Sequence, residues 1–226
     1  MICYHKSSGR QFSGSGCRFF KLKKMKVLIA CEFSGVVRDA FIAKGHDAVS
    51  CDLLPTETPG HHYQGDVFDI INNGFDLMIA FPPCTHLSSS GAAWFAEKRK
   101  DGRQRMAIEF FLRIANAPIK KIAIENPVGI MSSIYRKPDQ IIQPYFFGDD
   151  DQKTTCLWLK NLPKLFHAAD VDLFNDTITH VAPVIITTKN GYRGSRIHFM
   201  PPGRDRGKLR SKTFPGIAYA MAMQWG

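Results

Sequence analysis

Short apolar segments that alternate with helical patterns are the feature that most restricts the fold of this 226-residue chain. Five segments are typical of buried strands, because they are short, apolar and followed by polar or turn residues: 26–30 (KVLIA), 46–52 (HDAVSCD), 75–81 (FDLMIAF), 121–126 (KIAIEN) and 155–159 (TCLWL). Strands that alternate with helices predict an α/β fold with a mostly parallel, Rossmann-like sheet covered by helices on both faces.

Apolar residues at helical spacing indicate two helices between these strands. Val37, Ala40 and Phe41 follow the first strand, and Gly45 is placed to end that helix. The segment 103–117 precedes the fourth strand, and its predicted apolar face consists of Met106, Phe110, Phe111 and Ile114. With 44% hydrophobic residues, the chain is long enough for one large core and short for two independent domains.

The positive charge is concentrated in two segments of a chain whose formal net charge is +10. Residues 1–24 contain six Lys and Arg and no acidic residue, and residues 189–212 contain eight Lys and Arg and one Asp. The first segment is rich in Ser and Gly and lacks a hydrophobic period, which indicates a disordered extension before Met25. The second indicates a surface that binds phosphate polyanions, with a merely solvated segment as the alternative.

The cysteines and the apolar segments favour a cytosolic protein. Six cysteines without a C-x-x-C pair or a secretory context favour reduced thiols over disulfides or a zinc site. No apolar stretch reaches 18 residues, and the N-terminus lacks the order of a secretory signal, so no membrane span is expected. His61 and His62 have no third and fourth ligands at metal spacing, so no metal is expected either.

Polar residues directly after the strands are the candidates for a ligand site, because ligands of parallel sheets bind beyond the carboxyl ends of the strands. Phe33, Ser34 and Gly35 follow the first strand, where a glycine turn lets backbone amides approach a ligand. Asp52 follows the second strand, where a carboxylate accepts hydrogen bonds from both ribose hydroxyls of a nucleoside, or only caps a turn. Asp66 is placed to reach an adenine edge, with a plain turn residue as the alternative.

The third strand is followed by FPPCTHLSSSG, in which Pro82 and Pro83 fix the backbone directly before Cys84. A cysteine presented from a stiff turn is a candidate nucleophile, whereas a structural cysteine would more naturally lie inside the apolar run. No P-C-x-x-C follows and no H-x-E precedes Cys84, which disfavours a deaminase. Residues 85–102 are rich in Ser and Gly, and we expect a mobile loop that closes over a substrate.

Glu125 lies at the end of the fourth strand, in the sequence AIENP, and is a candidate partner for Cys84. If the third and fourth strands are neighbours, both side chains lie at the same edge of the sheet. Partial burial at the end of an apolar strand suits a carboxyl group to sharing a proton with a substrate. The alternative is a carboxylate that only caps nearby amides.

Taken in this order, the motifs resemble those of the DNA cytosine-5 methyltransferase family, in particular its short phage-type members. EFSG at 32–35 resembles the cofactor loop, Asp52 the ribose-binding acid, GDV the adenine-side motif, PPC the nucleophile motif and ENP the glutamate motif. QKTTCLWL resembles the strand that supports the target base, and RSKTFPGIAYAMAMQW the terminal helix that returns to the cofactor pocket. The resemblance covers residues 26–226, and the paired PPC and ENP motifs, 41 residues apart, are its specific part.

The resemblance implies a class I S-adenosylmethionine-dependent methyltransferase and assigns roles to four segments. These are a disordered extension (1–24), a catalytic methyltransferase domain (25–160), a reduced target-recognition and basic segment (161–205), and a C-terminal helix that returns to the catalytic domain (206–226). The implied catalytic residues are Cys84 and Glu125. The implied cofactor-binding residues are Phe33, Ser34, Gly35, Asp52, Asp66 and Pro82, and the implied substrate-binding residues are Asn126, Gln152, Thr154, Arg204, Arg206 and Arg210.

The sequence departs from the family pattern at several positions. Val37 stands where the first motif usually has a second glycine, Thr154 and Cys156 replace two arginines of the later strand motif, and Pro127 follows the glutamate motif where valine is common. Only about 50 residues separate LWL from RSKTFPG, where larger members carry a long target-recognition region. We therefore expect limited sequence specificity.

The implied reaction is methyl transfer from S-adenosylmethionine to carbon 5 of cytosine in DNA, through a covalent cysteine adduct and without a metal. Two alternatives come from the same pattern: a related one-carbon transfer or the modification of a free nucleotide, and a catalytically silent relative that binds DNA. A Rossmann oxidoreductase is a third, which the missing glycine fingerprint disfavours. No feature of the sequence predicts an oligomeric state.

Overall fold

The computed structural model describes residues 23–167, 181–203 and 205–226. Its strands are β1 (Lys26–Ala30), β2 (Asp47–Asp52), β3 (His62–Gln64), β4 (Leu77–Ala80), β5 (Lys121–Pro127), β6 (Gln140–Ile142), β7 (Thr155–Lys160), β8 (Ile185–Thr187) and β9 (Arg193–Ser195). Its α-helices are α1 (Val36–Ala43), α2 (Val67–Ile70), α3 (Phe95–Lys100), α4 (Arg103–Ala115), α5 (Met131–Ile134), α6 (Arg206–Ser211) and α7 (Pro215–Trp225). Two 3-10 helices are η1 (Ser89–Trp94) and η2 (Pro144–Phe147). The extension predicted at residues 1–24 lies outside the described residues except for Lys23 and Lys24.

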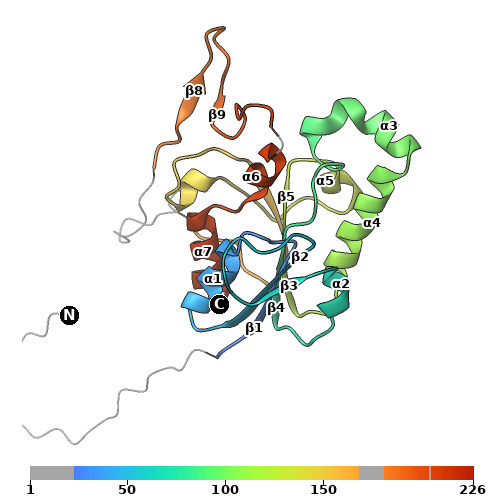
Figure 1. Ribbon diagram of the computed structural model, residues 1–226, viewed down its shortest axis with the longest axis vertical. Coiled ribbons are helices and arrows are strands. Elements are labelled where there is room, and N and C mark those ends of the chain that lie inside the picture. The colour runs from blue at the N-terminus through green and yellow to red at the C-terminus, as the bar shows by residue number, and fades with distance from the viewer. Residues whose placement is uncertain (1–22, 168–180, 204) are drawn as a thin grey trace, which may run out of the picture.

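Seven strands form one sheet, in the order β3-β2-β1-β4-β5-β7-β6 (Figure 1). The five strands from β3 to β5 are parallel, whereas β7 runs antiparallel to both β5 and β6. All five strands that the sequence predicts are present, and β3 and β6 are added to them at the two edges. The predicted α/β fold with a mostly parallel, Rossmann-like sheet is therefore confirmed.

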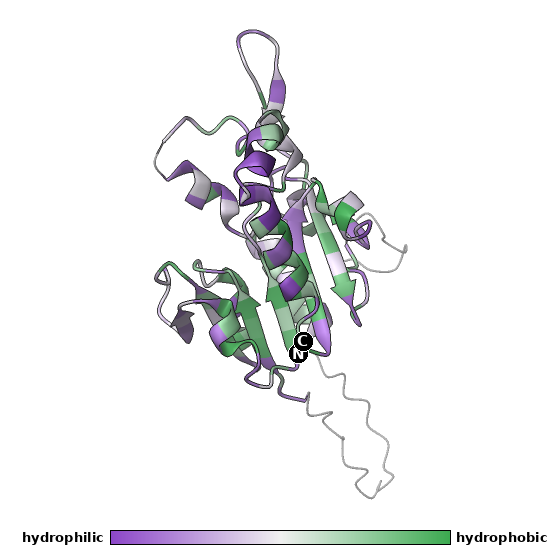
Figure 2. Cartoon of the chain, turned by 90° about the vertical axis from the view of Figure 1, so that its right-hand side faces the viewer, coloured by the Kyte–Doolittle hydropathy of each residue, from purple (hydrophilic) through white to green (hydrophobic). Residues whose placement is uncertain are grey.

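Two apolar layers cover this sheet, and they arise from the alternation of side chains along each buried strand. Val27 and Ile29 of β1 pack in one cluster with residues of α1 and α7, and Leu28 and Ala30 pack in the other with residues of α2 and α4. Figure 1 shows these two pairs of helices on opposite sides of the sheet. Figure 2 shows the apolar strands between them.

The two predicted helices form as α1 and α4, with one error in the predicted apolar face. Gly45 has a φ of +89° and its amide donates to the carbonyl of Ile42, so it ends α1 as predicted. In α4, Phe111 and Ile114 are fully buried, but Met106 is 66% exposed. The buried stripe of α4 begins at Gln104, which is about 200° of helical rotation away from Met106.

The C-terminal part of the chain returns to the sheet after a hairpin. Strands β8 and β9 pair antiparallel and extend beyond the sheet in Figure 1, and Arg196 pairs with Asp150 and Asp151 near the start of β7. Helix α7 then packs beside α1, and its Trp225 is buried and donates to the carbonyl of Pro163. Within the described ranges, no helix combines the length and the apolar character needed to cross a membrane.

Candidate functional site

The register of the parallel strands brings the candidate residues to one edge of the sheet. Ala30 of β1 pairs with Cys51 of β2 on one side and with Ala80 of β4 on the other, and Ala80 pairs with Ile124 of β5. The residues that follow these positions therefore leave the sheet at the same level. This edge carries the loop 31–35, Asp52, the segment 81–84 and Glu125.

The loop between β1 and α1 is held by a buried carboxylate that the predicted set of cofactor-binding residues did not include. One oxygen of Glu32 accepts hydrogen bonds from the amide of Val37 and the hydroxyl of Ser34, each at 2.9 Å. Burial raises the pKa of the Glu32 carboxyl group, although these two hydrogen bonds oppose the shift. The second oxygen is buried and has no hydrogen-bond partner among the described residues. The sequence signal that could have identified Glu32 is an acidic residue four residues before the start of α1.

Gly35 is needed at its position for two reasons. Its φ of +79° lies in the left-handed region, which side chains other than glycine rarely adopt. A β-carbon at this position would lie 2.1 Å from the hydroxyl oxygen of Thr58. Phe33 and Ser34, also predicted for the cofactor, are both buried. The turn thus brings the start of α1 and the loop between β2 and β3 into direct contact.

Arg38 organises that second loop, and the sequence analysis did not identify it. Its side chain is completely buried, and its guanidinium group donates to the carbonyls of Thr58 and Pro59 and to the hydroxyls of Ser50, Thr56 and Thr58. It also pairs with Asp39 at 2.8 Å. One charged side chain therefore fixes residues 56–59, which form the wall next to the Gly35 turn. No local pattern distinguishes such an arginine from one on the surface of a helix.

Asp52 and Asp66 both cap local turns, which was the alternative interpretation of each. Asp52 accepts a hydrogen bond from the amide of Leu54 at 2.9 Å, and Asp66 accepts one from the amide of Phe68 at 3.0 Å. Each bond uses one carboxylate oxygen, and the other oxygen has no hydrogen bond in the described part of the chain. The two acids face a common region, because both contribute to raising the pKa of the Cys31 thiol after burial itself. Their capping roles therefore leave an acceptor on each for a ligand.

Cys84 and Glu125 come together because β4 and β5 are neighbours. Burial raises the pKa of the Cys84 thiol, and the next largest cause is the charge of Glu125. Two cations, Lys153 and Arg210, act in the opposite direction. One oxygen of Glu125 is buried and has no hydrogen-bond partner among the residues that the structure describes. The pair thus consists of a half-buried thiol and a carboxylate with an unused acceptor.

Asn126, which was predicted to bind the substrate, holds the turn before Cys84. It is 1% exposed, and its side-chain amide donates to the carbonyl of Pro82 at 2.8 Å. The carbonyl of Cys84 in turn accepts hydrogen bonds from the amides of Leu87 and Ser88. Pro82 is buried behind this turn. The Cys84 backbone is therefore fixed from both sides, and Asn126 connects it to the strand that carries Glu125.

The segment that follows Cys84 is helical over much of its length, whereas the sequence predicted a loop. It forms η1 and α3, and the buried Lys98 donates to the carbonyl of Thr85 at 2.8 Å. Ser88 forms an isolated bridge with Gly129, and a β-carbon on Gly129 would lie 2.2 Å from the carbonyl oxygen of Leu87. The backbone after Cys84 is thus packed directly against the backbone after Glu125.

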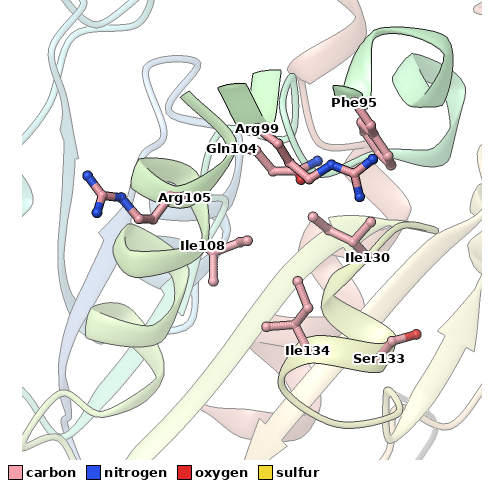
Figure 3. Close-up of a pocket in the computed structure, with 8 residues that line it drawn as sticks. All are labelled: Phe95, Arg99, Gln104, Arg105, Ile108, Ile130, Ser133 and Ile134. Carbon is pink, nitrogen blue, oxygen red and sulfur yellow. The ribbon is translucent and has the colours of Figure 1, made fainter. Parts of the chain in front are cut away.

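A groove of about 420 Å³ lies beside this pair of segments, between α3, α4 and α5. Figure 3 shows Phe95 and Arg99 at one end of the groove and Ile134 on the opposite wall. Gln104, which also lines it, donates to the carbonyl of His86 at 3.3 Å. This hydrogen bond therefore joins the groove to the segment that follows Cys84.

The remaining predicted substrate-binding residues are placed differently from one another. Gln152 and Thr154 are exposed before β7, and Thr154 accepts a hydrogen bond from Gln143. Arg206 donates to the carbonyl of His198, and Arg210 lies close enough to Cys84 to affect its pKa. Arg204 lies outside the described residues. Among the described residues of the full predicted set, Asn126 contacts the turn before Cys84, and Arg210 affects the pKa of the Cys84 thiol by its charge.

Helix α6 lies against Phe33 in the loop between β1 and α1 and against Glu57 in the loop between β2 and β3, contacts that the sequence did not predict. Lys208 and Lys212 pair with Glu57 at 3.1 and 2.5 Å, and the Lys208 ammonium group lies 5.1 Å from the centre of the Phe33 ring. Part of the basic segment 189–212 is therefore engaged with the protein itself, while Lys189 and Arg193 remain exposed at the β8–β9 hairpin. In the described part of the chain, no group of three or more His, Cys, Asp or Glu side chains is placed to hold a metal ion.

Solved structures include chains that are similar to this one. No protein-family model matches the sequence, and no curated protein matches it. A solved structure of the Entamoeba histolytica methyltransferase EhMeth is similar to this chain, with 14% sequence identity and a TM-score of 0.44 over 72% of the residues. The chain spans 58% of the length of EhMeth. Likeness at this level assigns neither a family nor an activity.

Proposed function

We propose that this chain is a methyltransferase that uses S-adenosylmethionine to methylate carbon 5 of cytosine in DNA, with Cys84 as a covalent nucleophile. The observation that carries the proposal is the pairing of Cys84 with Glu125, whose buried oxygen lacks a partner in the described structure. Around it, the carboxyl edge of a mostly parallel sheet is the usual place for a nucleoside ligand. The order of the PPC and ENP motifs along the chain gives the same assignment.

The residues at the β1 and β2 ends fit the nucleoside part of the cofactor. The Gly35 turn leaves the start of α1 free of a side chain, and Asp52 and Asp66 each keep one oxygen without a hydrogen bond among the described residues. Ribose hydroxyls and an adenine amino group are donors that such oxygens accept. When bound, S-adenosylmethionine supplies an electrophilic methyl group.

The chain's own residues prepare the base to receive that methyl group. The Cys84 thiolate adds to carbon 6 of cytosine, which gives carbon 5 the character of a carbanion. Glu125 stabilises the adduct by a hydrogen bond to ring nitrogen 3 and by accepting one from the amino group. With S-adenosylmethionine in place, carbon 5 would form a bond to the methyl group as the bond from the methyl group to the sulfonium breaks, and S-adenosylhomocysteine would leave. The proton on carbon 5 then goes to a base, the electron pair of that C–H bond restores the double bond between carbons 5 and 6, and the Cys84 thiolate is expelled. Lys153 and Arg210 favour the charged form of Cys84 during this sequence.

DNA as the substrate is supported by the basic segment at the same end of the molecule. Lys189 and Arg193 are exposed on the hairpin, where their charges can contact DNA phosphates. Contacts with phosphates position a nucleic acid without reading its sequence. A target base in a duplex would have to be flipped out of the stack, at a cost of a few kcal/mol. This cost is smaller for single-stranded DNA.

Trapping with 5-fluorocytosine tests the covalent step. This base can accept the thiol and the methyl group but cannot lose a proton from carbon 5, so the adduct persists. DNA that contains it should give a denaturant-resistant complex with wild-type protein and S-adenosylmethionine, and none with Cys84→Ala. Glu125→Gln should slow trapping by roughly 10²- to 10⁴-fold, the range for loss of a general acid.

Cys156 offers a matched control, because burial and then the charge of Glu125 raise the pKa of its thiol to about 11. It is 1% exposed and lies within β7, so Cys156→Ala should trap normally. A complex that persists in Cys84→Ala would refute the assignment of the nucleophile. Trapping of 5-fluorodeoxycytidine monophosphate but not of DNA would favour the free nucleotide as substrate, and binding of DNA without any adduct would favour a silent relative.

A further inference from the structure

Helix α6 is attached to the rest of the protein mainly through one acidic residue. None of its six residues is buried, and its N-terminus has no side-chain cap. Glu57 places one carboxylate oxygen against Lys208 and the other against Lys212. These ion pairs lower the pKa of the Glu57 carboxyl group, Lys212 more than Lys208. A further attachment, from Arg206 to the carbonyl of His198, joins α6 only to the neighbouring C-terminal segment.

Glu57 is itself tied to the cofactor loop. Its backbone amide donates to the carbonyl of Phe33 at 2.9 Å, and the hydroxyl of the adjacent Thr58 donates to the carbonyl of Ser34 at 3.2 Å. The Lys208 ammonium group completes the unit by lying over the Phe33 ring. Helix α6 thus lies over the loop that the proposed function assigns to the cofactor, and Glu57 connects α6 to this loop.

We propose that Glu57 is a positioning residue that latches α6 over the Phe33–Gly35 turn, and that this latch retains the cofactor. The inference rests on the proposed function, since it takes this turn as part of the cofactor pocket. The α6 latch consists of Glu57, Lys208 and Lys212.

The exposure of the three side chains makes this a contact that opens and closes. They are 29%, 40% and 34% exposed for Glu57, Lys208 and Lys212. Ion pairs between partly exposed groups contribute little each and are screened by salt. The latch therefore holds α6 at low ionic strength and yields without unfolding the core, as exchange of a bound cofactor requires.

Amide hydrogen exchange in the cofactor-free protein tests the latch itself. Glu57→Gln should speed exchange at residues 206–211 by roughly tenfold, the effect of losing two such pairs. Added salt should speed exchange in the wild type and leave the variant nearly unchanged. Glu109→Gln is the matched control, because Glu109 is the exposed partner of Arg105 on α4, far from α6 in the chain. It should leave the exchange of α6 as it is.

Cofactor dissociation followed by stopped flow tests the consequence. S-adenosylmethionine should leave Glu57→Gln several-fold faster than wild type, while the thermal midpoint stays the same. A charge exchange, Glu57→Lys with Lys208→Glu and Lys212→Glu, should restore slow dissociation, which a merely structural role of Glu57 would not explain. Wild-type protein that fails to bind S-adenosylmethionine would overturn the proposed function and this inference together. Normal wild-type binding with unchanged exchange and dissociation in Glu57→Gln would overturn the inference alone.

Discussion

Replacing Arg38 with alanine should destabilise the protein far more than removing an ordinary arginine from a helix. The guanidinium group makes four hydrogen bonds to the loop between β2 and β3 and one to Ser50 of β2, and its side chain is fully buried. In Arg38→Ala, the backbone carbonyls of Thr58 and Pro59 lose the charged group that donates hydrogen bonds to them. The ion pair with Asp39 adds little, because the Asp39 side chain is 46% exposed.

The expected loss in the free energy of unfolding is roughly 3–5 kcal/mol, the range for removing one partner from a buried charged network. Hydrogen bonds to charged groups contribute about 1.5–3 kcal/mol each, so their sum would exceed this range. The loss is smaller than that sum because the hydroxyls of Ser50, Thr56 and Thr58 can turn to other partners. A loss of this size is a large part of the total stability of a domain. Arg38→Lys should fall between wild type and Arg38→Ala, since lysine keeps the charge without the planar fork.

Urea denaturation followed by circular dichroism measures this loss directly. The midpoint should fall while the slope stays constant, because the same surface is exposed on unfolding. Arg99→Ala is the control: Arg99 is exposed and forms no ion pair with the described residues, so the change should stay within about 0.5 kcal/mol. A loss below about 1 kcal/mol for Arg38→Ala would refute the reasoning, because the loop would then be held by something other than this arginine.

The site and the basic segment give three further predictions. After burial, the charge of Glu125 is the next largest cause that raises the pKa of the Cys84 thiol, so Glu125→Gln should lower that pKa. Alkylation of Cys84 by iodoacetamide at a fixed pH near neutral should then be faster, although the same change slows trapping. Slower alkylation would contradict the charge effect. Asp52→Ala should weaken S-adenosylmethionine binding in a calorimetric titration, and unchanged affinity would leave Asp52 as a turn cap only. Replacing Lys189 and Arg193 together with alanine should reduce the dependence of log K for DNA on log salt by about two, and an unchanged slope would mean that the hairpin does not contact phosphates.

The sequence predicts β1, β4 and β5 well because each contains a continuous apolar run that is buried on both faces. Strands β3 and β6 are not predicted, since each has three residues at an edge of the sheet and depends on a neighbour for its form. Strands β8 and β9 are equally short. Local pattern carries little information about strands of this kind.

The candidate site likewise has a part that the sequence predicts and a part that it does not predict. The position of Cys84 and Glu125 at one edge follows from two adjacent strands whose ends are visible in the sequence. The burial of Arg38 and the pairing of Glu57 with α6 depend instead on contacts between distant segments, and charged residues are ordinarily expected on the surface. The hydrogen bond from the Asn126 amide to the Pro82 carbonyl likewise joins two distant segments, and the substrate role predicted for Asn126 stays a prediction.

The packing of Gly129 on the Leu87 carbonyl limits how this protein can vary among its descendants. The two segments meet through backbone atoms, so no side chain at residue 129 can take up the space or adjust the fit. An insertion between Cys84 and Ser88, or between Glu125 and Gly129, would have to be matched by a change in the other segment. Between Cys84 and Gly129, length variation should therefore be confined to the residues between Ser89 and Glu125, and the two segments should be inherited, exchanged or redesigned as one piece.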